Sequence, residues 1–92
     1  MTDAFRLDGK VAVVTGGGKG IGRGIALCLA DAGADVVVAA RTLSEVQSVA
    51  AEVEAKGQRA IGLSVDVTNT DQIEALAQTA KELGQVDIWV NN

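Results

Sequence analysis

The stretch that decides the fold reads Val11-Ala12-Val13-Val14-Thr15-Gly16-Gly17-Gly18-Lys19-Gly20-Ile21-Gly22. It starts with an apolar, β-branched run typical of a buried strand, and a helical pattern follows the glycines directly. The first turn of a helix has backbone N–H groups without intrahelical partners, and the helix dipole adds roughly half a positive charge there. Since glycine leaves this backbone open to a ligand, the stretch predicts a pyrophosphate site and points to a dinucleotide.

The spacing of the glycines narrows the class of nucleotide site. The fingerprint G-x-G-x-x-G fits in no register, and a Walker-type loop needs Ser or Thr where Gly20 follows Lys19. The pattern that fits is T-G-x-x-x-G-x-G, on Thr15, Gly16, Gly20 and Gly22. The alternative is a glycine-rich surface turn without a ligand.

A methyltransferase is a further alternative, because Gly18, Gly20 and Gly22 also fit the G-x-G-x-G pattern of many S-adenosylmethionine enzymes. Those enzymes usually carry one carboxylate just before the glycines and another at the end of the second strand. Gly16 and Arg41 stand at these positions, which disfavours this interpretation.

Composition limits the other classes of function. At 92 residues the chain is one domain at most, and 48% hydrophobic with 2% aromatic residues predicts an aliphatic core. A net charge of −4 does not favour binding to nucleic acid or to an anionic membrane. No apolar run reaches the roughly 20 residues that a membrane span needs. One cysteine and no histidine exclude an internal disulfide and argue against a metal site. Residues 1–6 lack the shape of a signal peptide, so we expect a cytoplasmic protein.

Apolar runs and helical stripes alternate along the chain. Strands are expected at 10–15, 35–40, 59–65 and 86–90, and helical stripes at 21–32, 46–53 and 73–83. This order with short connections predicts an α/β fold, a Rossmann-type doubly wound parallel sheet. Residues 1–92 would supply only its N-terminal β-α-β-α-β-α-β portion. The last strand ends with an uncovered edge, which suggests that further strands belong there.

Local signals add expectations for caps and the core. Thr42 begins a capping-box pattern, and Thr68 or Thr70 is expected to cap the third helix. Cys28 lies on an apolar stripe and is expected to be buried, and Trp89 is expected in the core.

With these residues in place, the chain resembles the N-terminal half of a short-chain dehydrogenase/reductase over essentially all 92 residues. Four features carry the resemblance: the turn at 15–22, Arg41 ending the second strand, Asp66-Val67 after the third, and Asn91-Asn92 after the fourth. In that family this asparagine pair is normally the start of the motif Asn-Asn-Ala-Gly. The resemblance therefore implies an NAD(P)-binding segment at 1–92 that is truncated before the catalytic half.

The resemblance assigns the glycine turn to the pyrophosphate. Gly16 would allow the tight turn out of the strand, Gly20 would let the backbone approach the pyrophosphate, and Gly22 would allow close helix packing. Gly18 belongs to the same cofactor-binding set. Ile21 would offer its amide to a phosphate and its side chain to the nicotinamide.

Neighbouring residues are given structural tasks. Thr15 is expected to tie the loop together by hydrogen bonds, and Gly24 to serve helix packing. Asn91 and Asn92 resemble the pair that lies along the adenosine ribose and steadies the fourth strand.

Arg41 carries the prediction of cofactor preference. NAD-selective Rossmann sites usually place Asp or Glu at this position for the ribose hydroxyls, whereas a guanidinium suits a 2′-phosphate. Lys19 is the second basic residue that the family uses for that phosphate, and Thr42 would add a hydroxyl contact. We therefore expect NADP(H) to be preferred over NAD(H); the alternative is that both cations are ordinary surface charges.

The end of the third strand is assigned to the adenine. By resemblance the Asp66 carboxylate accepts from the adenine amino group, with the Val67 backbone beside it. The alternative is a turn aspartate that precedes Thr68.

The implied activity is hydride transfer between the nicotinamide and a small-molecule carbonyl or alcohol substrate. The family uses a tyrosine as general acid/base, a lysine four residues on, a serine and an asparagine; this chain has no tyrosine, so no catalytic residue is carried over and the chain alone should be inactive. A homo-oligomer is expected for the intact protein. The competing hypothesis is a stand-alone, non-catalytic dinucleotide-binding or interaction module.

Overall fold

The computed structural model describes residues 6–92, so the expectation for the amino terminus lies largely outside the described residues. Strands and helices alternate as β1 (Val11–Thr15), α1 (Gly20–Asp31), β2 (Asp35–Ala40), α2 (Leu43–Ala55), β3 (Ala60–Ser64), α3 (Thr70–Lys81) and β4 (Val86–Asn91). The predicted order of elements is confirmed, with bounds that differ by a few residues.

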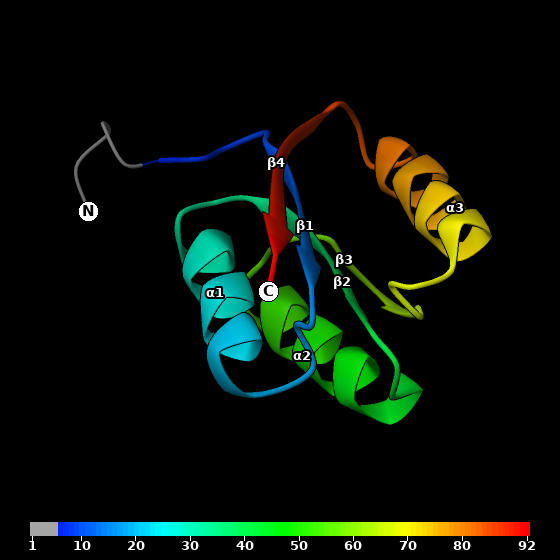
Figure 1. Ribbon diagram of the computed structural model, residues 1–92. Helices are drawn as coiled ribbons and strands as arrows, with labels where there is room; N and C mark the ends of the chain where they lie inside the picture. Colours follow the sequence, from blue (N-terminus) through cyan, green and yellow to red (C-terminus); the bar gives the residue numbers. More distant parts are fainter. Residues whose placement is uncertain (1–5) are drawn as a thin grey trace.

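The strands form one parallel sheet in the order β3-β2-β1-β4. The chain moves outward from β1 to β3 and then returns to the other side of β1 for β4. Helices α1 and α2 cover one face of the sheet, and α3 lies on the other (Figure 1). The predicted doubly wound parallel sheet is therefore confirmed, and the order reverses at β1, where open α/β sheets bind their ligands.

Successive side chains of the central strands pack into two separate hydrophobic cores, one on each face of the sheet. One core joins the sheet to α1 and α2, and its buried members are Val14, Ala26, Ala30, Val36, Val38, Val46, Val49 and Val53. The other joins the sheet to α3 through Val13, Val37, Ala39, Val65, Leu76 and Ala80. Because both faces are covered, β1 and β2 read as continuous apolar runs instead of alternating ones.

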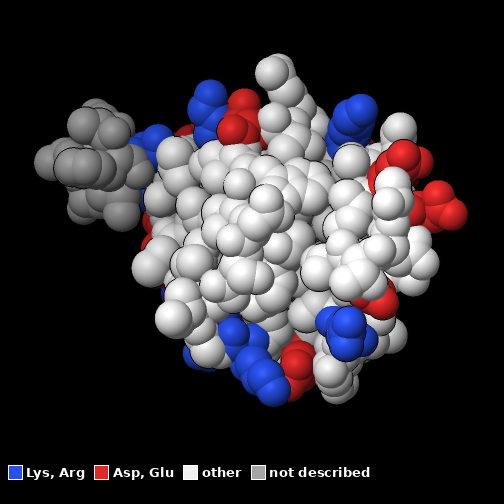
Figure 2. Space-filling view, viewed as in Figure 1, with Lys and Arg blue, Asp and Glu red and all other residues white. Residues whose placement is uncertain are grey.

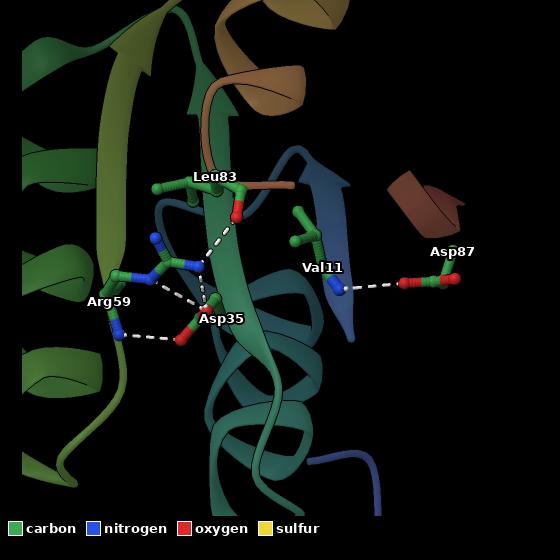
Figure 3. A network of polar contacts seen from close by, with 5 residues as sticks. All are labelled: Val11, Asp35, Arg59, Leu83 and Asp87. Atoms are coloured by element: carbon green, nitrogen blue, oxygen red, sulfur yellow. Dashed lines mark hydrogen bonds and ion pairs between the residues drawn. The ribbon is translucent and has the colours of Figure 1, made fainter. Parts of the chain in front are cut away.

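A polar network joins the elements at the amino ends of the strands (Figure 3). The Arg59 guanidinium donates to Asp35 Oδ2 over 2.8 Å and to the Leu83 carbonyl over 2.6 Å. The Val11 amide donates to Asp87 Oδ2 over 3.2 Å. The Val11–Asp87 contact connects β1 to β4. The Arg59 contacts connect β2 to the segments before β3 and after α3. All of them lie at the opposite end of the strands from the glycine turn.

The caps differ from the expectation. Thr42 is the N-cap residue of α2, but its side chain makes no capping hydrogen bond. Asn69, and neither Thr68 nor Thr70, caps α3, and its side-chain oxygen accepts from the Gln72 amide over 3.1 Å. The prediction for Thr68 was wrong because its hydroxyl donates a hydrogen bond to Asp66.

Cys28 and Trp89 are not buried, so both expectations were wrong. Helix α1 meets the sheet through Ala26 and Ala30, and Cys28 lies between them in sequence, on the opposite side of the helix. Trp89 is 36% exposed beside Val13 at the sheet edge, where its indole N–H donates to Asn91 Oδ1 over 2.9 Å.

Strand β4 is an edge strand, and among the described residues it pairs only with β1. Charged side chains lie mainly around the rim of the face seen in Figure 2, and Asp87, which contacts Lys10, is the charged residue within β4. Apart from Asp87 this edge strand carries no charged side chain, and such an edge can accept a further strand.

Candidate functional site

The candidate site lies at the carboxyl ends of the strands, around the turn from β1 into α1. Helix α1 begins at Gly20, and its N-cap residue Lys19 makes no side-chain capping bond. The first turn contains no acidic residue, so no carboxylate of the helix itself competes for its backbone N–H groups. These amides are suited to a phosphate.

The shape of the turn depends on glycine at specific positions. Gly16 and Gly20 have positive φ angles, 66° and 60°. A Cβ at Gly22 would lie 2.0 Å from the Gly16 carbonyl oxygen and 2.7 Å from Asn92 Nδ2. The absence of a side chain at Gly22 therefore allows α1 to pack directly against the glycine turn that precedes it. A Cβ on Gly24 would meet nothing within 4 Å, so the packing role expected for Gly24 was wrong.

Thr15 and Asn92 hold the turn against β4. The buried Thr15 hydroxyl donates to the Val90 carbonyl and accepts from the Asn92 amide, each over 3.3 Å. The Asn92 side chain donates to the Gly16 carbonyl over 3.1 Å. Thr15 thus ties the loop together as expected, and Asn92 braces the glycine turn. Asn91 turns to Trp89 instead.

A cavity of about 260 Å³ lies beside the turn. It is lined by Gly16, Gly18, Lys19, Ala40, Arg41, Thr42 and Glu45. The structure thus brings the two predicted phosphate cations, from the start of α1 and the end of β2, to one cavity. Their side chains are 83% and 75% exposed, for Lys19 and Arg41, which leaves both heads free to move toward a ligand.

Each cation is paired with a carboxylate. Lys19 Nζ lies 3.8 Å from Glu45 Oε2, and Arg41 Nη2 lies 3.6 Å from Asp66 Oδ1. Sequence reasoning missed Glu45 as a site residue, since it was considered only as part of the capping-box pattern. Its position four residues after Arg41, in the first turn of the next helix, is the signal that was available.

Asp66 forms a turn with Thr68. Its Oδ1 accepts from the Thr68 hydroxyl over 2.7 Å and from the Thr68 amide over 2.9 Å. The Thr68 hydroxyl lowers the pKa of Asp66 most, followed by the Thr68 amide; burial opposes this shift, and Arg41 lowers the pKa further. The carboxylate is therefore ionised at neutral pH, and the hydrogen bonds that it accepts from Thr68 both end at Oδ1, not at Oδ2.

Two apolar residues of the predicted site are open to solvent. Ile21 is 77% exposed at the start of α1, and Val67 is 55% exposed after β3. Exposed apolar side chains on the ligand side of an α/β sheet are available for contact with a flat, partly apolar molecule. In the described part of the chain, no three His, Cys, Asp or Glu residues gather as a metal site would require, and none of its helices meets the length and apolarity of a membrane span.

The sequence model of the short chain dehydrogenase family matches residues 10–92. The chain belongs to this family. An uncharacterized oxidoreductase of Mycobacterium tuberculosis is 50% identical over 98% of the chain and 35% of its own length. The 7alpha-hydroxysteroid dehydrogenase of Escherichia coli K12 is 44% identical over 99% of the chain and 36% of its own length.

A solved structure extends the comparison to three dimensions. A 7 alpha-hydroxysteroid dehydrogenase complexed with NADH and 7-oxo glycochenodeoxycholic acid superposes with a TM-score of 0.93 at 42% identity, covering 100% of this chain and 37% of that one. The chain thus spans about a third of the length of the curated relatives that it matches. Membership in this dehydrogenase family does not favour the stand-alone module or the methyltransferase.

Proposed function

We propose that this chain forms the adenosine- and pyrophosphate-binding part of an NADP(H)-dependent short-chain dehydrogenase/reductase. The observation that carries the proposal is the convergence of Lys19 and Arg41 on one cavity beside a helix N-terminus. The cofactor supplies the hydride acceptor or donor when it is bound. The chain supplies binding and orientation.

The residues present fit such a cofactor. A Cβ at Gly22 would collide with the Gly16 carbonyl, so glycine keeps the turn tight and its amides open to the pyrophosphate. Asp66 Oδ2 is available to accept from the adenine amino group, with Val67 beside it. Thr42 lines the same cavity as Arg41 and would contact the 2′-phosphate through its hydroxyl.

Further residues of the turn and of the end of β4 complete the proposed cofactor site. Gly18 and Gly20 leave room for the phosphates, and the Ile21 side chain extends toward the nicotinamide. Asn91 and Asn92 lie along the adenosine ribose, and Asn92 keeps its bond to the turn.

The whole protein is proposed to transfer hydride between the nicotinamide and a carbonyl or alcohol substrate. It is proposed to be a cytoplasmic homo-oligomer. No tyrosine lies in the chain, so the general acid/base would come from elsewhere in the protein. The structure of one relative contains NADH, so the experiment below compares the binding of NADP⁺ with that of NAD⁺.

The test is the Arg41→Asp substitution. It replaces a phosphate-binding guanidinium with a carboxylate that suits the ribose hydroxyls, so NADP⁺ binding should weaken by roughly ten- to a hundredfold and NAD⁺ binding much less. Lys81→Asp is the matched control, because it makes the same charge change at the far end of α3. Dissociation constants from calorimetry decide the point: equal losses for the two dinucleotides would refute the phosphate role.

A further inference from the structure

The charges around the proposed phosphate cavity cancel. Lys19 is paired with Glu45, and Arg41 is paired with Asp66. A 2′-phosphate that enters this cavity therefore meets one carboxylate on the wall, that of Glu45, as well as the two cations, while Asp66 contacts Arg41 without lining the cavity. Asp66 already has an assigned partner in the adenine, whereas Glu45 has no task in cofactor binding.

Glu45 is held at the cavity wall by the fold. It lies in the first turn of α2, and its side chain is 35% exposed, against 83% for Lys19. A Cβ on Gly18 would lie 3.0 Å from the Glu45 Cβ and 3.3 Å from its Oε1. The Glu45 side chain thus lies directly beside the glycine turn, in the lining of the cavity.

The two members of the Lys19–Glu45 pair respond differently to a ligand. An exposed ion pair of this length is weak, so Lys19 can leave it for a phosphate at little cost. Glu45 stays on the wall, and its negative charge then repels the same phosphate across a small cavity. The ribose hydroxyls of NAD(H) carry no charge and do not meet this repulsion.

Resting on the function proposed above, we infer that Glu45 is a specificity-determining residue that limits the preference for a 2′-phosphorylated dinucleotide. It acts through its charge against the phosphate. The Lys19 and Arg41 cations favour NADP(H) over NAD(H), and the Glu45 carboxylate reduces the size of that preference.

Glu45→Gln tests this inference in the purified protein. NADP⁺ should bind roughly three- to tenfold more tightly to the variant, with NAD⁺ affinity changed less than about twofold. The gain should shrink at high salt, because screening weakens the repulsion that the wild-type carboxylate exerts. Glu54→Gln is the matched control, since it makes the same change on the exposed side of the same helix and should leave both affinities unchanged.

The outcomes separate this inference from the proposed function. If the wild type binds both dinucleotides and Glu45→Gln leaves their affinity ratio unaltered, the inference fails and the cofactor site stands. If Glu54→Gln raises NADP⁺ affinity equally, the effect is one of net charge and the inference also fails. If the wild type binds 2′,5′-ADP no better than 5′-AMP, the proposed phosphate site fails and the inference falls with it.

Discussion

The Arg41 guanidinium lies 3.6 Å from the Asp66 carboxylate and so joins the end of β2 to the segment that follows β3. The two residues are assigned to neighbouring parts of one ligand, the 2′-phosphate and the adenine. Because Arg41 approaches Oδ1, where Thr68 also donates, Oδ2 stays available. In the proposed site this pair would set the spacing between the 2′-phosphate and the adenine before any ligand enters.

Asp66→Asn should change the choice of base. A carboxylate accepts from the adenine amino group and repels the carbonyl of hypoxanthine, whereas an amide can donate to that carbonyl. We expect the wild type to prefer NADP⁺ over its hypoxanthine analogue by roughly tenfold, and the variant to lose most of this preference. Competition binding measures the ratio; an unaltered preference in the variant would remove Asp66 from the adenine site.

Thr68→Val should raise the pKa of Asp66. The Thr68 hydroxyl is the largest cause of the lowered pKa, and valine removes it while keeping the shape of the side chain. In the wild type, the stabilising contribution of Asp66 is complete above its ordinary pKa and is lost as the pH falls through the lower folded pKa. In the variant the folded pKa lies closer to the ordinary one, so this contribution should be smaller and its loss should be complete at a higher pH.

An NMR titration of the Asp66 carboxyl carbon measures this shift directly. Thr68→Ser is the control, because it keeps a hydroxyl and should keep the lowered pKa. The same pKa in the wild type and in Thr68→Val would contradict the assignment of the cause.

Gly22→Ala should destabilise the protein and weaken dinucleotide binding. The added methyl would collide with the Gly16 carbonyl oxygen, and relief of the clash must move α1 or the turn. Overpacking of this kind costs about 1–3 kcal/mol, and each kcal/mol lowers the melting temperature by roughly 4–8 °C. Calorimetric melting gives the stability, and titration with NADP⁺ gives the affinity.

Gly24→Ala is the matched comparison, two residues along the same helix. Nothing lies within 4 Å of the position that its Cβ would take. Alanine is the better helix former, so this variant should gain about 0.5–1 kcal/mol and bind normally. Similar losses in both variants would show that the close contact at Gly22 is not the cause.

Arg59→Met should lower stability without affecting the cofactor. It removes the bonds to Asp35 Oδ2 and the Leu83 carbonyl, although the Arg59 amide still donates to Asp35 Oδ1 over 2.9 Å. Since the guanidinium is largely exposed, the expected loss is only about 1 kcal/mol. Urea unfolding measures it, with Lys10→Met, whose contact to Asp87 is 4.0 Å, as a near-neutral control. A weaker affinity for NADP⁺ in Arg59→Met would contradict the separation of the network from the site.

The sequence was a good guide to the order of elements and to the glycine turn. Both depend on local signals: uninterrupted β-branched runs, helical spacing, and glycine where the backbone must turn. It was a poor guide to burial at Cys28 and Trp89, because an apolar residue on a stripe is buried only where a neighbouring element covers it. The prediction of the residue that caps α3 was wrong for a similar reason, because the Thr68 hydroxyl donates to Asp66 instead.

By itself the sequence determined the alternation of strand and helix, the open helix start and the presence of cations suited to a phosphate. Only the tertiary structure decided what those cations face. The Lys19–Glu45 and Arg41–Asp66 pairs, and the approach of Gly22 to Gly16 and Asn92, join residues that are mostly far apart along the chain. Their distances follow from how the parallel sheet and its crossovers bring strand ends together, which no local pattern specifies.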